Sequence, residues 1–95
     1  MPKGYVIGRA NVTNPTAWAE YAAKAGEAMK KYGGNPIVRG GKMETVEGQG
    51  VPRNIIEFAS FEAAQTYARS SEYAAAKKLR QGAGTLDLVI VEGAP

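Results

Sequence analysis

Residues 53–60 read Arg-Asn-Ile-Ile-Glu-Phe-Ala-Ser, and this stretch, a strand that leads into a helix cap, decides much of the fold. Because successive side chains of a β-strand point to opposite faces, the strand has two unlike faces. One face carries Asn54, Ile56 and Phe58, and the other carries Arg53, Ile55 and Glu57. The second face, where a guanidinium and a carboxylate flank an isoleucine, either meets water or lines an enclosed space.

The composition indicates one ordinary globular domain. The chain has 95 residues, of which 44% are hydrophobic and 22% are charged. A chain of this length folds around a single core, so residues 1–95 are expected to form one domain. No apolar run reaches the roughly 20 residues of a membrane-spanning helix, and the start lacks the apolar segment of a secretory signal. We therefore expect a complete, cytoplasmic protein with no membrane partner.

The chain contains no cysteine and no histidine. Without cysteine there can be no disulfide, thiolate metal ligand or thiol nucleophile. Without histidine the commonest general base and the commonest metal ligand are absent, so neither a metal nor another cofactor is expected. The net charge of +3 is dispersed rather than clustered, and no specific nucleic-acid partner is expected.

The first half of the chain alternates between strand and helix patterns. Residues 5–12 suit a strand on which Gly8 and Ala10 form a small face, which would let a helix approach the sheet closely. Asn14 and Pro15 are typical of a helix start, and an apolar stripe continues to the glycines at 33 and 34. This pattern predicts a helix that ends near Lys31.

The second half repeats the pattern with interruptions. Residues 35–39 and 42–47 suit strands, separated by a glycine pair that predicts a bulge or a sharp bend, and residues 48–52 form a hairpin loop. Ser60 is placed to cap a helix, and Ser70 with Ser71 is expected to kink or divide it, with Ser71 as the second cap. Residues 86–91 are nearly all apolar, as in a strand covered on both faces.

The resulting order β-α-β-β-α-β predicts an α+β, ferredoxin-like sandwich. In this fold an antiparallel sheet carries helices on one face, and its first and third strands are central. The opposite face is too apolar to remain exposed to water. It carries Tyr5, Ile7, Arg9, Ile55, Glu57, Val89 and Val91. We therefore predict a homodimer through the sheet face, in which the two sheets face each other as a barrel-like sandwich.

Five short motifs occur in a characteristic order, although none of them alone is specific to one family. They are Tyr32-Gly33-Gly34, Arg39-Gly40-Gly41, Glu47-Gly48 before Arg53, Phe58-Ala59-Ser60-Phe61-Glu62-Ala63, and Ser70-Ser71-Glu72-Tyr73 ahead of Arg80. In this order the chain resembles the short bacterial proteins grouped as domain of unknown function 1330 (DUF1330), in the dimeric α/β-barrel superfamily. The resemblance implies a ferredoxin-like dimer and no established activity. The chain departs from it at Tyr67-Ala68, where members often have an aromatic pair, and at Ser71, where they often have proline.

The open sheet face supplies the first candidate ligand residues, Arg9 and Glu57, on adjacent central strands. They either anchor an acidic or carbonyl ligand inside the barrel or form an ion pair that bridges the strands or the dimer. The structural interpretation is favoured.

A second candidate group lies beside glycines and strand ends. It consists of Arg39, Arg53 and Arg80, with Tyr67, Ser70 and Tyr73 nearby on the second helix. Converging arginines could grip a carboxylate or phosphate, or each could brace a carbonyl or a carboxylate. The glycine bend after Arg39 is the first place to look for a small anionic or carbonyl ligand, because bulges often lie beside functional sites.

Two functions remain open. A noncatalytic, homodimeric binding or structural module is favoured, because no catalytic constellation is visible. The alternative is a metal-independent small-molecule enzyme, monooxygenase-, isomerase- or decarboxylase-like, with a pocket at the sheet face and a tyrosine or carboxylate for proton transfer. The sequence identifies no catalytic residue and leaves open whether the protein is an enzyme.

Overall fold

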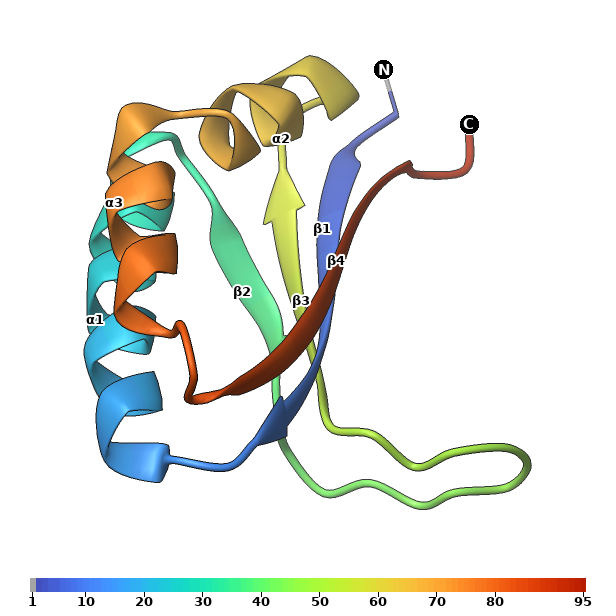
Figure 1. Ribbon diagram of the computed structural model, residues 1–95. Coiled ribbons are helices and arrows are strands. Elements are labelled where there is room, and N and C mark those ends of the chain that lie inside the picture. Colours follow the sequence, from blue (N-terminus) through green and yellow to red (C-terminus); the bar gives the residue numbers. More distant parts are fainter. Residues whose placement is uncertain (1) are drawn as a thin grey trace.

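A computed structural model describes residues 2–95 and shows a four-stranded antiparallel sheet with helices on one side (Figure 1). The elements are β1 (Gly4–Val12), α1 (Pro15–Lys31), β2 (Asn35–Arg39), β3 (Arg53–Phe58), α2 (Phe61–Ala68), α3 (Ser71–Leu79) and β4 (Gly84–Glu92). The strand order is β2-β3-β1-β4, so the first and third strands are central. The predicted α+β, ferredoxin-like fold is confirmed, and the sheet of one chain is open rather than closed.

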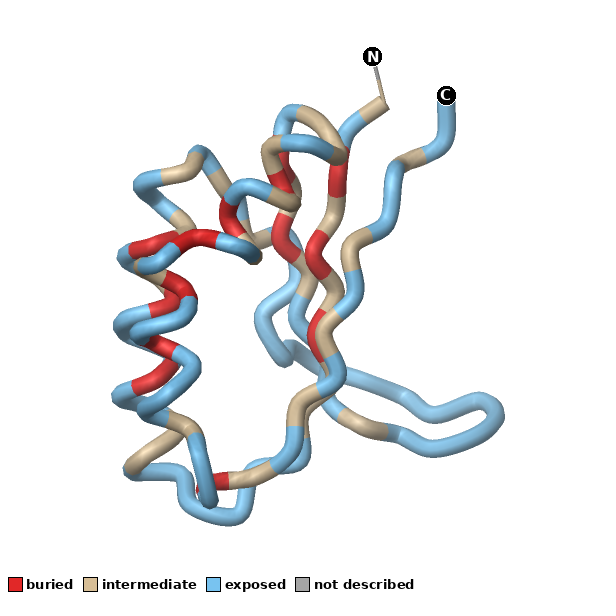
Figure 2. The backbone as a smooth tube through the Cα atoms, turned by 45° about the horizontal axis from the view of Figure 1, so that its top comes forward, coloured by how far each residue is buried: buried red, intermediate tan, exposed pale blue. Residues whose placement is uncertain are grey.

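The register of the strands separates the two faces of the sheet. Val6 lies opposite Ile56 and Ile90 on the face beneath the helices, whereas Ile7 lies opposite Ile55 and Val89 on the other face. Buried residues concentrate on the helix-facing side (Figure 2). Val89 and its neighbour Val91 on β4 are 51% and 44% exposed. In a single chain β4 is therefore covered on one face, not on both as its sequence suggests.

α1 begins and ends where its sequence predicts. The side chain of Asn14 accepts a hydrogen bond from the Ala17 amide at 3.2 Å, and Pro15 occupies the first helical position, where its missing amide proton costs nothing. Gly33 follows with a φ of 78°, a left-handed conformation that favours glycine after a helix end.

The second helical segment is divided in two, as predicted, but at a different cap. Ser70, not Ser71, caps α3: its Oγ accepts from the Tyr73 amide at 3.0 Å and donates to the Tyr67 carbonyl at 2.7 Å. One buried hydroxyl therefore serves the end of α2 and the start of α3. Within residues 2–95, no helix is both long and apolar enough to cross a membrane.

Residues 40–52 form an exposed loop that projects away from the helices (Figure 1), so the strand predicted over 42–47 is wrong. The Gly40 amide still bonds to the Arg53 carbonyl at 3.1 Å, and the Ala10 amide bonds to the Pro52 carbonyl at 3.2 Å, but between these two ends the loop projects away from the sheet. An alternating sequence forms a β-strand only where a neighbouring strand completes its backbone hydrogen bonds. Residues 42–47 have no such neighbour within residues 2–95. The bulge lies between Pro36 and Val38, before the glycine pair that predicted it.

α1 packs along α3 more extensively than against any strand. The hydroxyls of Tyr21 and Tyr73 form a buried hydrogen bond of 2.9 Å between the two helices. At the end of α1, Glu72 of α3 accepts hydrogen bonds from the Lys31 ammonium and, at 2.8 Å, from the Tyr32 hydroxyl. These contacts hold α1 to α3 and leave its other side toward the sheet less closely packed.

Candidate functional site

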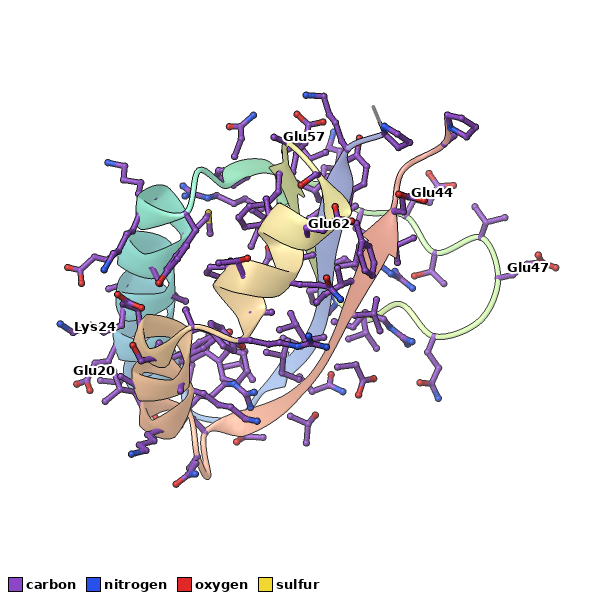
Figure 3. The ribbon with its side chains drawn as sticks, turned by 90° about the horizontal axis from the view of Figure 1, so that it is seen from above. Glu20, Lys24, Glu44, Glu47, Glu57 and Glu62 are labelled. Atoms are coloured by element: carbon purple, nitrogen blue, oxygen red, sulfur yellow. The ribbon has the colours of Figure 1, made fainter. Side chains whose placement is uncertain are left out.

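A cavity of about 530 Å³ lies between α1 and the helix-facing side of the sheet. α1 lines it with Trp18, Tyr21, Ala22, Ala23, Ala25, Gly26 and Met29, and the two central strands and β4 line it with Val6, Gly8, Ala10, Asn54, Ile56, Leu86 and Leu88. The charged side chains Glu20 and Lys24 lie on the outer side of α1 (Figure 3). The volume is within the range of about 300–1,000 Å³ that is typical of small-molecule sites.

Small residues on both walls create this cavity. Gly8 and Ala10 lie on the sheet side, and Ala22 and Gly26 lie on the helix side. A Cβ added at Gly26 would meet nothing within 4 Å, so the space beside this helical glycine is empty of protein atoms. α1 does not make the close approach that the small face of β1 predicts and packs mainly on α3, and the helix that chiefly contacts β1 is α2.

One edge of the cavity is polar. Arg39 of β2 and Asn54 of β3 lie directly opposite each other, and both side chains line the cavity while remaining exposed. Neither side chain has an ion pair or hydrogen-bond partner within residues 2–95. The cavity therefore has a free guanidinium and a free amide at an otherwise apolar wall.

The β-bulge in β2 brings consecutive residues to this edge. Val38 and Arg39 both line the cavity, whereas successive residues of a regular strand point to opposite faces. The register shift between Pro36 and Val38 disturbs that alternation. A bulge is therefore present near the predicted ligand residue Arg39, but within residues 36–38 rather than at the glycine pair 40–41.

A chain of aromatic rings runs from the cavity into the core. Trp18 and Tyr21 pack edge to face with 5.2 Å between centroids, Tyr21 bonds to Tyr73, and the Tyr73 and Tyr67 rings are 5.3 Å apart. Burial raises the pKa of Tyr21 far above its usual value, and the hydrogen bond to Tyr73 raises it further. Burial also raises the pKa of Tyr67. Tyr21 therefore remains protonated and acts as a hydrogen-bonding group rather than as a base.

The structure places Tyr67, Ser70 and Tyr73 together in the core rather than at the end of the sheet, and Arg80 at the other end of α3, beside Tyr21. Tyr67 and Tyr73 are 2% and 5% exposed, and Ser70 is the helix cap. The Arg80 guanidinium lies over the Tyr21 ring at 5.4 Å, and its Nε is buried without a partner within residues 2–95. These four residues lie outside the cavity lining, whereas Arg39 lies at the cavity edge and Arg53 lies opposite Arg9 on the sheet.

Arg9, Arg53 and Glu57 lie on the open face of the sheet. Arg9 is opposite Arg53 and Asp87, so the predicted Arg9–Glu57 ion pair does not form within the described chain. Glu57 instead accepts from the Tyr5 hydroxyl at 3.2 Å and pairs with an exposed lysine at 3.7 Å. Partial burial raises the pKa of Tyr5, and its bond to Glu57 raises it further.

A second, more open hollow of about 540 Å³ lies on that face beside Arg9. Ile7, Asp87 and Val89 also line it, together with Leu86 and Leu88. Arg53, whose guanidinium donates to the Val51 carbonyl at 3.3 Å, does not line it. The eight predicted site residues therefore divide among three places: the cavity edge, the core and the open face.

Sequence reasoning missed Asn54 and the small residues of α1. Asn54 shares a face of β3 with Ile56 and Phe58, and a polar side chain at that position is the signal that indicates it. Ala22 and Gly26 are one helical turn apart, opposite the small residues of β1. Four small residues on facing elements indicate either close packing or a hollow, and only the separation of the elements distinguishes the two.

The fold and the hollow between α1 and the sheet define an α+β protein of the ferredoxin-like class. The chain belongs to the DUF1330 family, domain of unknown function 1330, whose profile matches residues 3–94. No functionally curated protein matches it.

Solved structures share the fold at low sequence identity. A protein of unknown function from Rhodopseudomonas palustris is 19% identical, with a TM-score of 0.74 over 99% of this chain and 84% of that one. A candidate antibiotic biosynthesis monooxygenase from Caulobacter crescentus is 15% identical, with a TM-score of 0.62 over 99% and 92%. A dimeric, ferredoxin-like protein of unknown function from Bacteroides fragilis is 18% identical, with a TM-score of 0.50 over 96% and 94%.

Proposed function

We propose that the chain is a small-molecule-binding module whose ligand occupies the cavity between α1 and the sheet. The observation that carries this proposal is the cavity itself, about 530 Å³, with apolar walls and two polar side chains without protein partners, Arg39 and Asn54. A mostly apolar cavity with a few polar groups to orient the ligand is typical of binding sites.

The chemistry of the lining favours binding over proton transfer. Within the described residues, the cavity is lined by no carboxylate, and the chain has no histidine. Tyr21 is held in its protonated form by burial and by its bond to Tyr73, so it is a poor general base. A noncatalytic binding role therefore needs no proton-transferring group beyond the residues that line the cavity.

The module is proposed to be a cytoplasmic homodimer that buries the open face of the sheet. Val89 and Val91 are about half exposed there, next to Ile7 and Ile55, and such a continuous apolar surface favours a partner. The related fold from Bacteroides fragilis is described as dimeric. Arg9 and Glu57 remain candidates for an ion pair across this interface. Light scattering at micromolar concentration should give twice the chain mass, and a monomer would refute the dimer.

A second candidate is an enzyme that transforms the ligand in the same cavity. One feature favours it: the fold is shared with a candidate antibiotic biosynthesis monooxygenase. Mass spectrometry of bound aromatic compounds after incubation in air would detect a product. Recovery of unchanged ligand supports the noncatalytic role.

The binding proposal can be tested with 2-naphthoate, an aromatic probe that fits the cavity by size. Calorimetry should show one site per chain, and the amides of Gly8, Ala22 and Gly26 should shift in NMR spectra. Ala22→Leu, which fills the cavity, should weaken binding at least about tenfold, because the ligand and the leucine compete for one space. Ala75→Leu, the same change on the exposed side of α3, is the matched control. Equal binding by both variants would refute the proposal.

A further inference from the structure

The cavity is polar at one end only, and we infer that it selects a flat apolar molecule carrying one carboxylate, held at the Arg39–Asn54 edge. This inference rests on the proposed binding function and adds the chemical class of the ligand and its orientation. It follows from the order of side chains across the sheet, the shape of the cavity and the unpaired charge of Arg39.

One row of the sheet sets the orientation. Arg39 lies opposite Asn54, Asn54 lies opposite Gly8, and Gly8 lies opposite Leu88, so the row changes from charged to apolar across four strands. All four residues line the cavity. Since neighbouring strands are about 4.8 Å apart, the row spans about 14 Å. An elongated ligand can therefore place its anionic end at β2 and its apolar body toward β4.

The space beside Gly26 favours a ligand with a flat ring system. Gly26 on α1 lacks a side chain, and no protein atom lies within 4 Å of a Cβ built there, whereas the Leu86 and Leu88 side chains come within 3.4 Å of a Cβ built at Gly8 on the sheet. The bulkier lining residues include Trp18 and Met29 of α1. The open space beside Gly26, facing the flat apolar surface of the leucines, accepts a planar ring system, and an aromatic side chain and a thioether both pack well against aromatic rings.

The charge at the cavity edge favours an anion. No described carboxylate lies within ion-pair distance of the Arg39 guanidinium, although three lysines of the same chain have such partners. A guanidinium can bind both oxygens of a carboxylate, and the Asn54 amide can donate a further hydrogen bond. A neutral amide in place of the carboxylate keeps the shape and the carbonyl but loses the charge.

The test compares 2-naphthoate with 2-naphthamide, which has the same ring system and no charge. The wild-type protein should bind 2-naphthoate at least about tenfold more tightly, because hydrogen bonds between charged groups are stronger than neutral ones. Arg39→Gln should bring the two affinities close to each other by weakening naphthoate alone. Arg53→Gln, which removes the same charge from the neighbouring strand outside the cavity, should leave the ratio unchanged.

The outcomes separate this inference from the binding function. If both compounds bind equally to the wild type and Ala22→Leu weakens the binding of both, the cavity binds ligands but the anion preference is wrong. If neither compound binds, or Ala22→Leu has no effect, the binding function itself fails. If Arg53→Gln lowers the ratio as much as Arg39→Gln does, the preference is a general charge effect and the assigned anion site is overturned.

Discussion

α1 has two neighbours and meets them in opposite ways. Toward α3 it presents Tyr21, which is buried and hydrogen-bonded to Tyr73, and the two helices pack closely along each other. Toward the sheet it presents Ala22 and Gly26, and a cavity separates it from β1. The same helix is therefore a structural support on one side and a cavity wall on the other.

The difference shows how this small fold keeps a half-open cavity between α1 and the sheet. Interiors normally pack to high density, and an empty volume forfeits dispersion contacts. Here the Tyr21–Tyr73 hydrogen bond, together with the hydrogen bonds from Lys31 and Tyr32 to Glu72, holds α1 against α3 independently of the sheet, so the cavity does not collapse. We call the α3 side of α1 the packed side and the sheet side of α1 the hollow side. The contacts of the packed side stabilise α1 enough to leave a cavity on the hollow side, so mutations on the two sides should have different effects on stability.

The largest expected effect is on the packed side. Tyr67→Ala should lower the free energy of unfolding by about 3–5 kcal/mol, because the ring is 2% exposed and stacks on Phe58 at 5.3 Å. Leu88→Ala beside the cavity should cost less, since the leucine already borders empty space. Urea denaturation of both variants measures the difference, and equal losses would contradict the contrast.

The hydroxyl pair gives the next largest effect. Tyr73→Phe should cost about 1–2 kcal/mol, because the buried Tyr21 hydroxyl loses its partner at 2.9 Å. The double variant with Tyr21→Phe should cost less than the sum of the single changes, since it leaves no unpaired hydroxyl. A double-mutant cycle in urea measures this coupling. Strict additivity would show that the bond does not stabilise the packed side.

A substitution on the hollow side should stabilise the protein. Gly26→Ala should raise the free energy of unfolding by about 1 kcal/mol, because alanine favours a helix interior and the added Cβ meets no atom within 4 Å. Thermal unfolding measures the gain. A loss of stability would mean that the space beside Gly26 is filled in the native protein, in conflict with an open cavity.

The smallest effect depends on pH. Hydrogen bonds from Lys31 and Tyr32 lower the pKa of Glu72 from 4.5 to about 2. A carboxyl group with a lowered pKa in the folded state stabilises it above the unfolded value and loses this contribution as the pH falls. Glu72→Gln should therefore be less stable than wild type at pH 7, with a difference that shrinks between pH 4.5 and 2. A difference independent of pH would exclude this carboxylate as its source.

The fold was predictable from the sequence because its signals are local. Asn14-Pro15, Ser60 and the alternation around Ile56 mark helix starts and a strand, and the order of elements leaves few topologies. The site was less predictable, because it depends on the distance between elements. Arg39 was identified beside a bulge, but Tyr67 and Tyr73 lie in the core, and no sequence pattern shows that α1 stands away from β1.

The most direct test of the central claim is a crystal structure of the protein with 2-naphthoate. We expect the ring system between α1 and the sheet, near Gly8 and Gly26, with its carboxylate within hydrogen-bond distance of the Arg39 guanidinium. Side chains that fill this space in the crystal, or a ligand bound only on the open face of the sheet, would contradict the claim that the hollow side of α1 is the binding site.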